Sequence, residues 1–364
     1  MDQADVVSPF ASLCDLSKIA IFGVSVLLII HASRRVVLLE KEEKNSAEYS
    51  VHTLSCRDVT CFPIAGSFSL LLFFYCFDSI QYVFTLCVSV VSTVAGYTLF
   101  MPYTTMLCQP FEEQRKHIGH CGHLLGGEAT AVFIAVLLTF SWLYTGHWLL
   151  LDVLGVSLCV MMLQFFRLPN LRLSAILLCV LVIYDVFWVF FSSSVFESNV
   201  MVAVATKVAD NPVAMVADKL NLPGAAKTRP PLSIPGKLIF PSSIHSGHFS
   251  MLGLGDIILP GLLLCFAMRY DHAVMRATMA TDRISLACSK WSYFQISICG
   301  YALGLIFAAV AAEMFSSPQP ALLYLVPCTL IPFVVKATIQ GDLKSLWDGP
   351  FDQLQTKIST PTPV

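Results

Sequence analysis

The stretch that decides the fold is Leu173–Val195, LSAILLCVLVIYDVFWVFFSSSV, which is long and apolar enough to cross a bilayer. Its only charged residue is Asp185. A second apolar run, Phe249–Met268 (FSMLGLGDIILPGLLLCFAM), carries Asp256 near its start. A carboxylate at the centre of a membrane helix costs roughly 2.5 to 3.5 kcal/mol on insertion scales. We therefore expect both aspartates to have a function.

The two aspartates are predicted to lie at similar depths. In antiparallel spans, Asp185 is the thirteenth residue of one run and Asp256 the eighth residue of the other. Their depths then differ by only about 3 to 5 Å. Two carboxylates at short distance cannot both ionise easily, so they share a proton, and one acts as a base while the other acts as an acid. This is the chemistry of an aspartic protease, here in a lipid environment.

The composition indicates a polytopic membrane protein. Of the 364 residues, 56% are hydrophobic and only 13% are charged, and the mean hydropathy is +0.73. A soluble domain has about 25% charged residues. The net charge of -2 argues against a nucleic-acid partner. The thirteen cysteines include no C-x-x-C pair and lie mostly in apolar runs, which argues against a disulfide framework or a zinc ribbon.

Apolar runs predict an all-α fold with nine transmembrane helices. They cover residues 19–37, 62–80, 82–101, 128–145, 147–166, 173–195, 249–268, 293–314 and 320–340. Only a polar dip around Asp78 separates the second span from the third, and only Gly146 separates the fourth from the fifth. Fusion of either pair would change the parity of the topology.

The basic residues predict the orientation. With the N-terminus outside, 16 of the 22 Lys and Arg residues fall in cytosolic segments. Five of the other six lie in the long 196–248 loop, which the positive-inside rule governs only weakly. This asymmetry favours a lumenal N-terminus and a cytosolic C-terminus.

The predicted spans divide the chain into five segments. These are a lumenal N-terminus, first span and cytosolic loop (1–60), spans two to six (61–195), a lumenal loop (196–248), spans seven to nine (249–340) and a cytosolic tail (341–364).

Three short motifs lie in order along these spans. They are Tyr184-Asp185, Gly253-Leu254-Gly255-Asp256 and Pro320-Ala321-Leu322. Glycines beside an aspartate let the backbone leave the helical path, which a membrane tolerates only where a cavity is lined. In this order the motifs resemble those of the GxGD intramembrane aspartyl proteases, which include presenilin and the signal peptide peptidases. The match is most similar to the type-3 signal peptide peptidase-like subfamily and extends from about residue 62 over most of the chain, whereas the first 60 residues and the tail after Gly341 match less well.

The resemblance implies roles for these residues. Asp185 and Asp256 would be the catalytic pair. The remaining motif residues would border the substrate: Tyr184, Gly253, Leu254, Gly255, Pro320, Ala321 and Leu322. Hydrolysis would proceed without a covalent intermediate. Neither a metal ion nor another cofactor is expected.

The resemblance also implies a presenilin-like fold and a class of substrates. Proteins of this branch cleave type II membrane proteins, and for the type-3 subfamily the implied substrates are Golgi glycosyltransferases. Part of the 196–248 loop, with the stretch from Lys237 to Phe240, is expected to become ordered when substrate binds. The tail contains no dilysine or KDEL-type signal, which favours the Golgi over the endoplasmic reticulum or plasma membrane. Partners beyond the bilayer and substrates are not indicated, and self-association is left open.

Three alternatives stay open from the sequence. An ion-coupled transporter or channel also uses buried aspartates, although no internal repeat is evident. A signal-peptide peptidase of the endoplasmic reticulum would carry the same motifs. A membrane scaffold that retains the aspartates without using them is the third.

A few other polar residues lie in or near the spans. We interpret Asp152, six residues into the fifth span, as a structural hydrogen-bonding group, and Glu313 as a helix-end residue that reaches the interface. The cluster of His117, His120, Cys121 and His123 has residue types that suit zinc. A solvated loop is the favoured interpretation of this cluster.

Overall fold

The computed structural model describes eleven stretches of the chain: residues 15–43, 52–108, 116–117, 123–124, 126–196, 200–207, 209–211, 232–242, 249–280, 291–315 and 319–351. Eight helices in these stretches are long and apolar enough to cross a membrane. They are α2 (Leu16–Glu43), α3 (Cys56–Cys108), α4 (Gly126–Thr145), α5 (Trp148–Phe165), α6 (Leu171–Val186, continued to Phe196), α10 (Leu254–Ala280), α11 (Tyr293–Phe315) and α12 (Leu322–Gln340). The expected all-α polytopic fold is confirmed.

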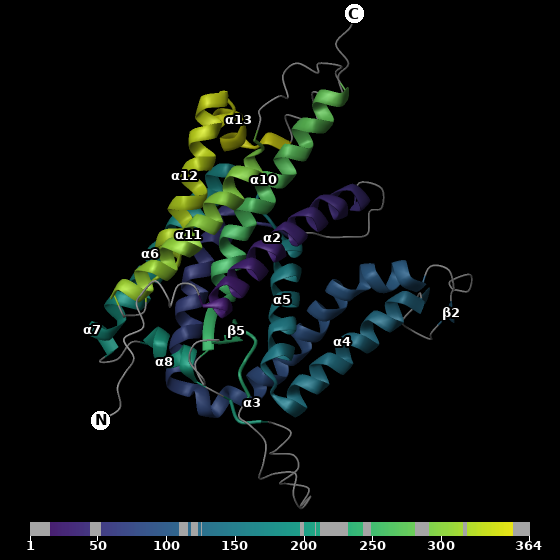
Figure 1. Ribbon diagram of the computed structural model, residues 1–364, viewed down its shortest axis with the longest axis vertical. Helices are drawn as coiled ribbons and strands as arrows, with labels where there is room; N and C mark the ends of the chain where they lie inside the picture. Colours follow the sequence, from purple (N-terminus) through teal and green to yellow (C-terminus); the bar gives the residue numbers. More distant parts are fainter. Residues whose placement is uncertain are drawn as a thin grey trace, which may run out of the picture.

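Helix α3 accounts for the difference between eight helices and nine predicted spans. Its 53 residues would extend about 80 Å if straight, far beyond a hydrocarbon core of about 30 Å. However, the rings of Phe73 and Phe84 lie 4.4 Å apart, although eleven residues of straight helix rise about 16 Å. The helix is therefore sharply bent near the polar dip at Asp78, as its two limbs in Figure 1 show. With these limbs counted separately, the helices correspond one to one with the nine predicted spans.

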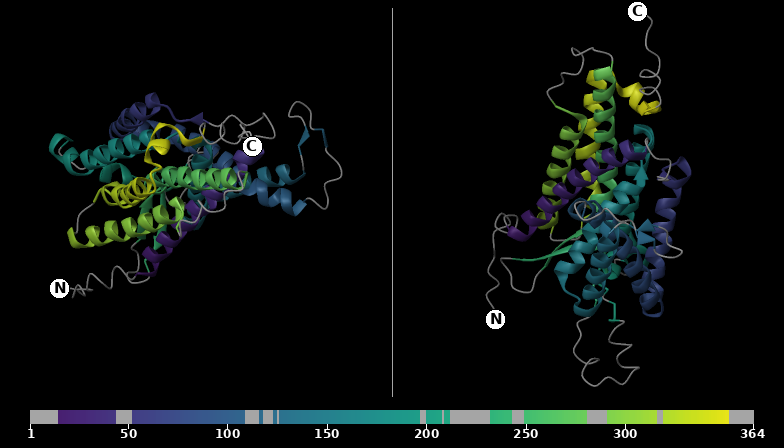
Figure 2. Two further views of the ribbon diagram at one scale, coloured as in Figure 1. Left: turned by 90° about the horizontal axis from the view of Figure 1, so that it is seen from above. Right: turned by 90° about the vertical axis from the view of Figure 1, so that its right-hand side faces the viewer.

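Helix α10 occupies the centre of the molecule, with α2, α5, α11 and α12 around it (Figures 1 and 2). Its residues Leu262 to Ala267 are all buried. A helix that is apolar on every side is stable only when other helices cover it. The central position of α10 follows from this composition.

Helices α11 and α12 approach closely at two glycines. A Cβ atom on Gly300 would lie 2.0 Å from the carbonyl oxygen of Cys328, and one on Gly304 would lie 3.0 Å from the Cα of Leu325. Small residues four apart allow such backbone contact between membrane helices. This contact fixes α12, whose first residue, Leu322, belongs to one of the three motifs.

The seventh span begins as a strand, and the prediction of a helix from Phe249 is wrong there. Residues Phe249–Gly253 form β6, which pairs antiparallel with β5 (Lys237–Pro241). The helix α10 begins only at Leu254. Pairing with β5 satisfies the backbone groups of β6 on that side. Non-helical backbone at membrane depth is tolerated where it lines a cavity, as residues 249–253 do. The stretch from Lys237 to Phe240, for which ordering on substrate binding is expected, lies in β5.

The remaining elements are short. They are β1 (His52–Thr53), β2 (Lys116–His117), β3 (His123–Leu124), β4 (Phe166–Arg167), the π-helix η3 (Phe187–Phe191), α7 (Ser192–Phe196), α8 (Val200–Thr206) and α13 (Leu343–Asp348). Strand β1 pairs parallel with β4, and β2 pairs antiparallel with β3.

Candidate active site

Asp185 lies one residue before the end of α6. Asn170 caps the start of the helix, and its side-chain oxygen accepts the N–H of Leu173 at 2.9 Å. Directly after Val186, the backbone widens into the π-helix Phe187–Phe191. Single π-turns inside helices occur frequently at functional sites. The Asp185 carboxyl is buried, with only 6% of the residue exposed.

Asp256 lies in the first turn of α10, three residues after the end of β6. The N-terminal end of a helix favours a carboxylate, because the unpaired N–H groups and the helix dipole present positive charge there. A Cβ atom on Gly253 would lie 3.2 Å from the Oδ2 atom of Asp256, so a glycine leaves the carboxyl its space. Unlike Asp185, Asp256 is partly exposed.

The third motif joins the two aspartates at the start of α12. The backbone N–H of Leu322 donates to Oδ2 of Asp185 at 3.3 Å. Ala321, the residue before Leu322, lines one cavity together with Asp256, and the charge of Asp185 acts on the Asp256 carboxyl. The three motifs, separated by up to about 137 residues along the chain, therefore meet at one place. A pair of carboxyls in this arrangement can share a proton and act as acid and base.

The turn before α12 is built from the other two residues of its motif. Pro320 is buried, and its carbonyl accepts the N–H of Leu323 at 3.2 Å. The carbonyl of Ala321 accepts the N–H groups of Tyr324 and Leu325, both at 3.1 Å. These bonds start the helix and aim the Leu322 N–H at Asp185.

Not every predicted motif residue lies beside the carboxyls. The Tyr184 hydroxyl packs on α3, where a Cβ atom on Gly66 would lie 3.1 Å from it. Leu254 is buried against Gly155 of α5. A Cβ atom on Gly255 would meet no described atom within 4 Å, so open space adjoins this glycine.

A cavity of about 360 Å³ opens beside Asp256. Strand β6, the start of α2, the C-terminal half of α11 and the turn before α12 line it. Its wall includes Phe22, Met251, Ala309 and Ala321. Asp256 therefore lines the cavity, whereas Asp185 is buried and is not part of the cavity wall.

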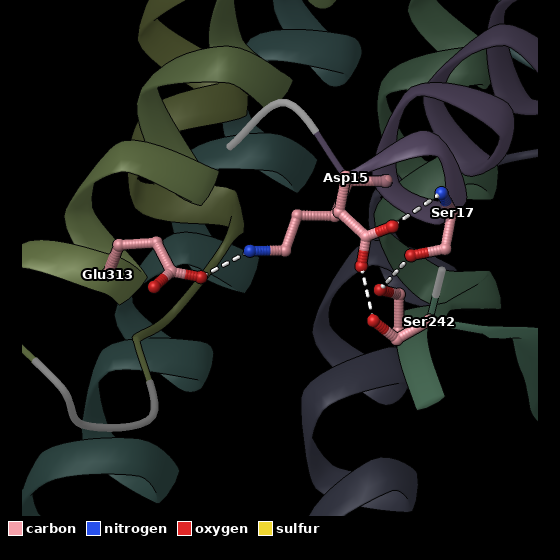
Figure 3. Close-up of polar contacts among 6 residues, drawn as sticks. Asp15, Ser17, Ser242 and Glu313 are labelled. Atoms are coloured by element: carbon pink, nitrogen blue, oxygen red, sulfur yellow. Dashed lines mark hydrogen bonds and ion pairs between the residues drawn. The ribbon is translucent and has the colours of Figure 1, made fainter. Parts of the chain in front are cut away.

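A polar cluster at the start of α2 borders this cavity (Figure 3). Lys18 forms an ion pair with Glu313 of α11. Ser242, which follows β5, donates to Asp15 at 2.5 Å, and the hydroxyl groups of Ser17 and Ser250 lie 2.7 Å apart. The cluster ties the first helix to both strands of the hairpin and to α11.

Sequence reasoning missed Tyr301 as well as this cluster. The Tyr301 hydroxyl on α11 donates to the backbone carbonyl of Asp256 at 3.4 Å. A tyrosine inside an apolar span gives no signal of such a contact, because its partner lies 45 residues away.

Among the described residues, no group of three or more His, Cys, Asp and Glu side chains is placed to hold a metal ion. Of the cluster considered for zinc, His117 and His123 pair across β2 and β3. His120 and Cys121 lie outside the described residues.

Comparison with known proteins identifies the family. The family model described as "Signal peptide peptidase" matches residues 46–353. Signal peptide peptidase-like 1 of Oryza sativa subsp. japonica is 34% identical over 349 residues, covering 93% of this chain and 94% of its own length. Signal peptide peptidase-like 1 of Arabidopsis thaliana is 36% identical over 321 residues, covering 85% and 86%. Signal peptide peptidase-like 2B of Mus musculus is 30% identical over 302 residues, covering 80% and 48%. The chain therefore belongs to the signal peptide peptidase family and is an intramembrane aspartic protease.

Proposed function

We propose that Asp185 and Asp256 are the catalytic pair of this protease. The observation that carries the proposal is the meeting of the three motifs, in which the Leu322 N–H binds the Asp185 carboxyl beside Asp256. One carboxylate deprotonates a water molecule, and the other protonates the oxygen of the scissile carbonyl. The partial exposure of Asp256 to the cavity supports water access from that side.

Within the described residues, the β6 edge of the hairpin is open to pairing with an unwound substrate. In the pairing of β5 with β6, the outward-facing residues of β6 are Phe249, Met251 and Gly253, and no hydrogen bond to their outward backbone groups occurs within the described stretches. The corresponding edge of β5 is occupied, because the Ile239 N–H is bonded to a side chain of α5. An unwound substrate would therefore pair with β6, and this main-chain pairing would bring the scissile bond to Asp256.

The substrates that we propose are type II membrane proteins, with Golgi glycosyltransferases as the first class to test. The asymmetry of 16 to 6 in basic residues supports a lumenal N-terminus and a cytosolic C-terminus. With this orientation, cleavage in or near the anchor would release the ectodomain into the lumen. Residence in the Golgi is part of the proposal.

The test uses one anchor in two orientations. A glycosyltransferase anchor is presented as a type II protein and, with its flanks exchanged, as a type I protein. Both are incubated in liposomes with the purified chain or with Asp256→Asn. We expect product from the type II form with the unsubstituted protein only. Equal cleavage of both forms would contradict the substrate class, and cleavage by Asp256→Asn would contradict the catalytic pair.

A further inference from the structure

Asp152 is a buried carboxyl inside a predicted span that does not belong to the catalytic pair. Asp152 is on α5, in an 18-residue helix otherwise formed by uncharged residues, and only 6% of it is exposed. A buried carboxyl inside a membrane span is costly, which makes a role for it the default expectation. The proposed chemistry does not use it.

The contact of Asp152 is with the hairpin. Its Oδ1 atom accepts the backbone N–H of Ile239 in β5 at 2.8 Å. Its Oδ2 atom is buried and has no hydrogen-bond partner within the described part of the chain. Within the described residues, the only hydrogen bond of the Asp152 carboxyl is therefore the one from β5.

Asp152 belongs to one face of α5 that holds three successive residues of β5. The ring of Trp148 lies 5.9 Å from that of Phe240, and a Cβ atom on Gly155 would lie 3.3 Å from the side chain of Leu238. Residues 148, 152 and 155 are separated by four and three positions, so they lie on the same helical face. Two of the three contacts are apolar and tolerate sliding, whereas the hydrogen bond to Ile239 specifies one register.

The register of β5 reaches Asp256 through β6. Ile239 pairs with Met251, and the Leu254 N–H donates to the Gly236 carbonyl at 3.2 Å, where the hairpin passes into α10. A slip of one residue in a strand would turn its side chains to the opposite face. Anchoring β5 on α5 therefore fixes the height of β6, and with it the height of a substrate strand relative to Asp256.

We propose that Asp152 is a positioning residue that fixes the register of the β5–β6 hairpin on α5 and thereby selects which substrate bond reaches the catalytic pair. The inference rests on the proposed function, because bond selection requires cleavage. The role needs an acceptor oxygen and not a negative charge, so asparagine should replace aspartate and leucine should not.

The first test measures cleavage positions. One type II substrate is cleaved by the unsubstituted protein, Asp152→Asn, Asp152→Leu and the control Ser157→Ala, and the product ends are identified by mass spectrometry. Ser157 is buried on the same helix, and within the described part of the chain its hydroxyl donates only to the carbonyl of Val153. We expect one dominant product from Asp152→Asn and Ser157→Ala. Asp152→Leu should spread cleavage over neighbouring bonds and lower kcat by about 10-fold. An unchanged product pattern in Asp152→Leu, or an equal spread in Asp152→Asn, would overturn the proposal.

The second test does not depend on catalysis. Hydrogen–deuterium exchange of the 237–241 segment is followed in the unsubstituted protein and in the same variants. The Ile239 amide should be protected in the unsubstituted protein and in Asp152→Asn, and should exchange about 10-fold faster or more in Asp152→Leu. Rapid exchange of Ile239 in the unsubstituted protein would overturn the proposal even if Asp152→Leu does not fold. If the unsubstituted protein cleaves no substrate but the Ile239 amide exchanges as expected in all variants, the result would count against the catalytic assignment and would still support the anchoring of the hairpin by Asp152.

Discussion

Helix α10 and the pair α3–α4 differ in how much of their apolar surface the protein itself covers. In the apolar 18-residue stretch of α10, 61% of the residues are buried, against 28% in α3 and in α4. Large side chains such as Phe68, Tyr75 and Phe133 point outward from α3 and α4. On a soluble protein such a surface would indicate a binding site, but on a membrane protein lipid covers it. Asp256 belongs to the enclosed region, where its environment is set by protein atoms.

The enclosed region is also where glycines permit backbone contact. Gly300 and Gly304 bring α11 and α12 together, and Gly253 makes room for the Asp256 carboxyl. In contrast, a Cβ atom on Gly23 of α2 would meet nothing within 4 Å. The space around each glycine, and not the residue type, therefore decides how much a substitution there costs.

The largest expected effect is on catalysis. Asp185→Asn and Asp256→Asn should each lower the rate of anchor cleavage by roughly 10²- to 10⁴-fold or more, because each removes an acid or base from the pair. Asp78→Asn, at the exposed bend of α3, should change the rate less than about 3-fold. Initial rates with the purified variants in liposomes provide the comparison. A catalytic pair is ruled out if either of the first two variants keeps the full rate.

The next effect is on stability. Gly300→Ala should destabilise the protein by about 1 to 3 kcal/mol or more, because its Cβ atom would lie 2.0 Å from a backbone oxygen of α12. Gly23→Ala should be neutral or stabilising by about 0.5 to 1 kcal/mol, because alanine is the better helix former. Thermal unfolding in detergent compares the two. Equal melting temperatures would contradict the described packing of α11 on α12.

A smaller effect on activity separates the two motif glycines. Gly253→Ala should lower kcat, because the added methyl group would lie 3.2 Å from the Asp256 carboxyl and displace it. Gly255→Ala enters open space and should cost less. Neither glycine has a positive φ, so the backbone conformation itself permits alanine at both positions. Steady-state rates on one substrate test the order, and a greater loss at Gly255 would indicate that substrate occupies the open space.

The smallest effect concerns the ion pair between Lys18 and Glu313. Both side chains are partly exposed, at 22% and 30%. Partly exposed pairs contribute at most about 1 kcal/mol. Lys18→Ala should therefore shift the melting temperature slightly, and the shift should shrink in high salt. A loss of several kcal/mol would show that the start of α2 is a structural anchor of the cavity.

The helices and the three motifs were predictable from the sequence because they depend on local patterns. Long apolar runs predict spanning helices, and the motif residues are close neighbours in the chain. The strand Phe249–Gly253 was not predictable in this way, since a short apolar run next to a longer one does not distinguish strand from helix. Its conformation depends on pairing with β5, eight or more residues away.

Contacts between distant segments explain the other misses. The hydroxyl of Tyr301 and the carboxyl of Asp152 have partners 45 and 87 residues away. Because Asp78 interrupts the apolar pattern, the sequence predicts two separate spans there, and it does not predict that they form one continuous, bent helix. The meeting of Leu322 with Asp185 across 137 residues followed from the resemblance and not from any local pattern.

The most direct test of the central claim is the affinity of an aspartyl-protease transition-state analogue for four proteins. These are the unsubstituted chain, Asp185→Asn, Asp256→Asn and the double variant. If both carboxyls hold the analogue together, each single variant should bind at least about 100-fold more weakly and the double variant no more weakly than either, since the effects of residues that act as a unit do not add. Binding by either single variant that matches the unsubstituted chain would contradict a shared site.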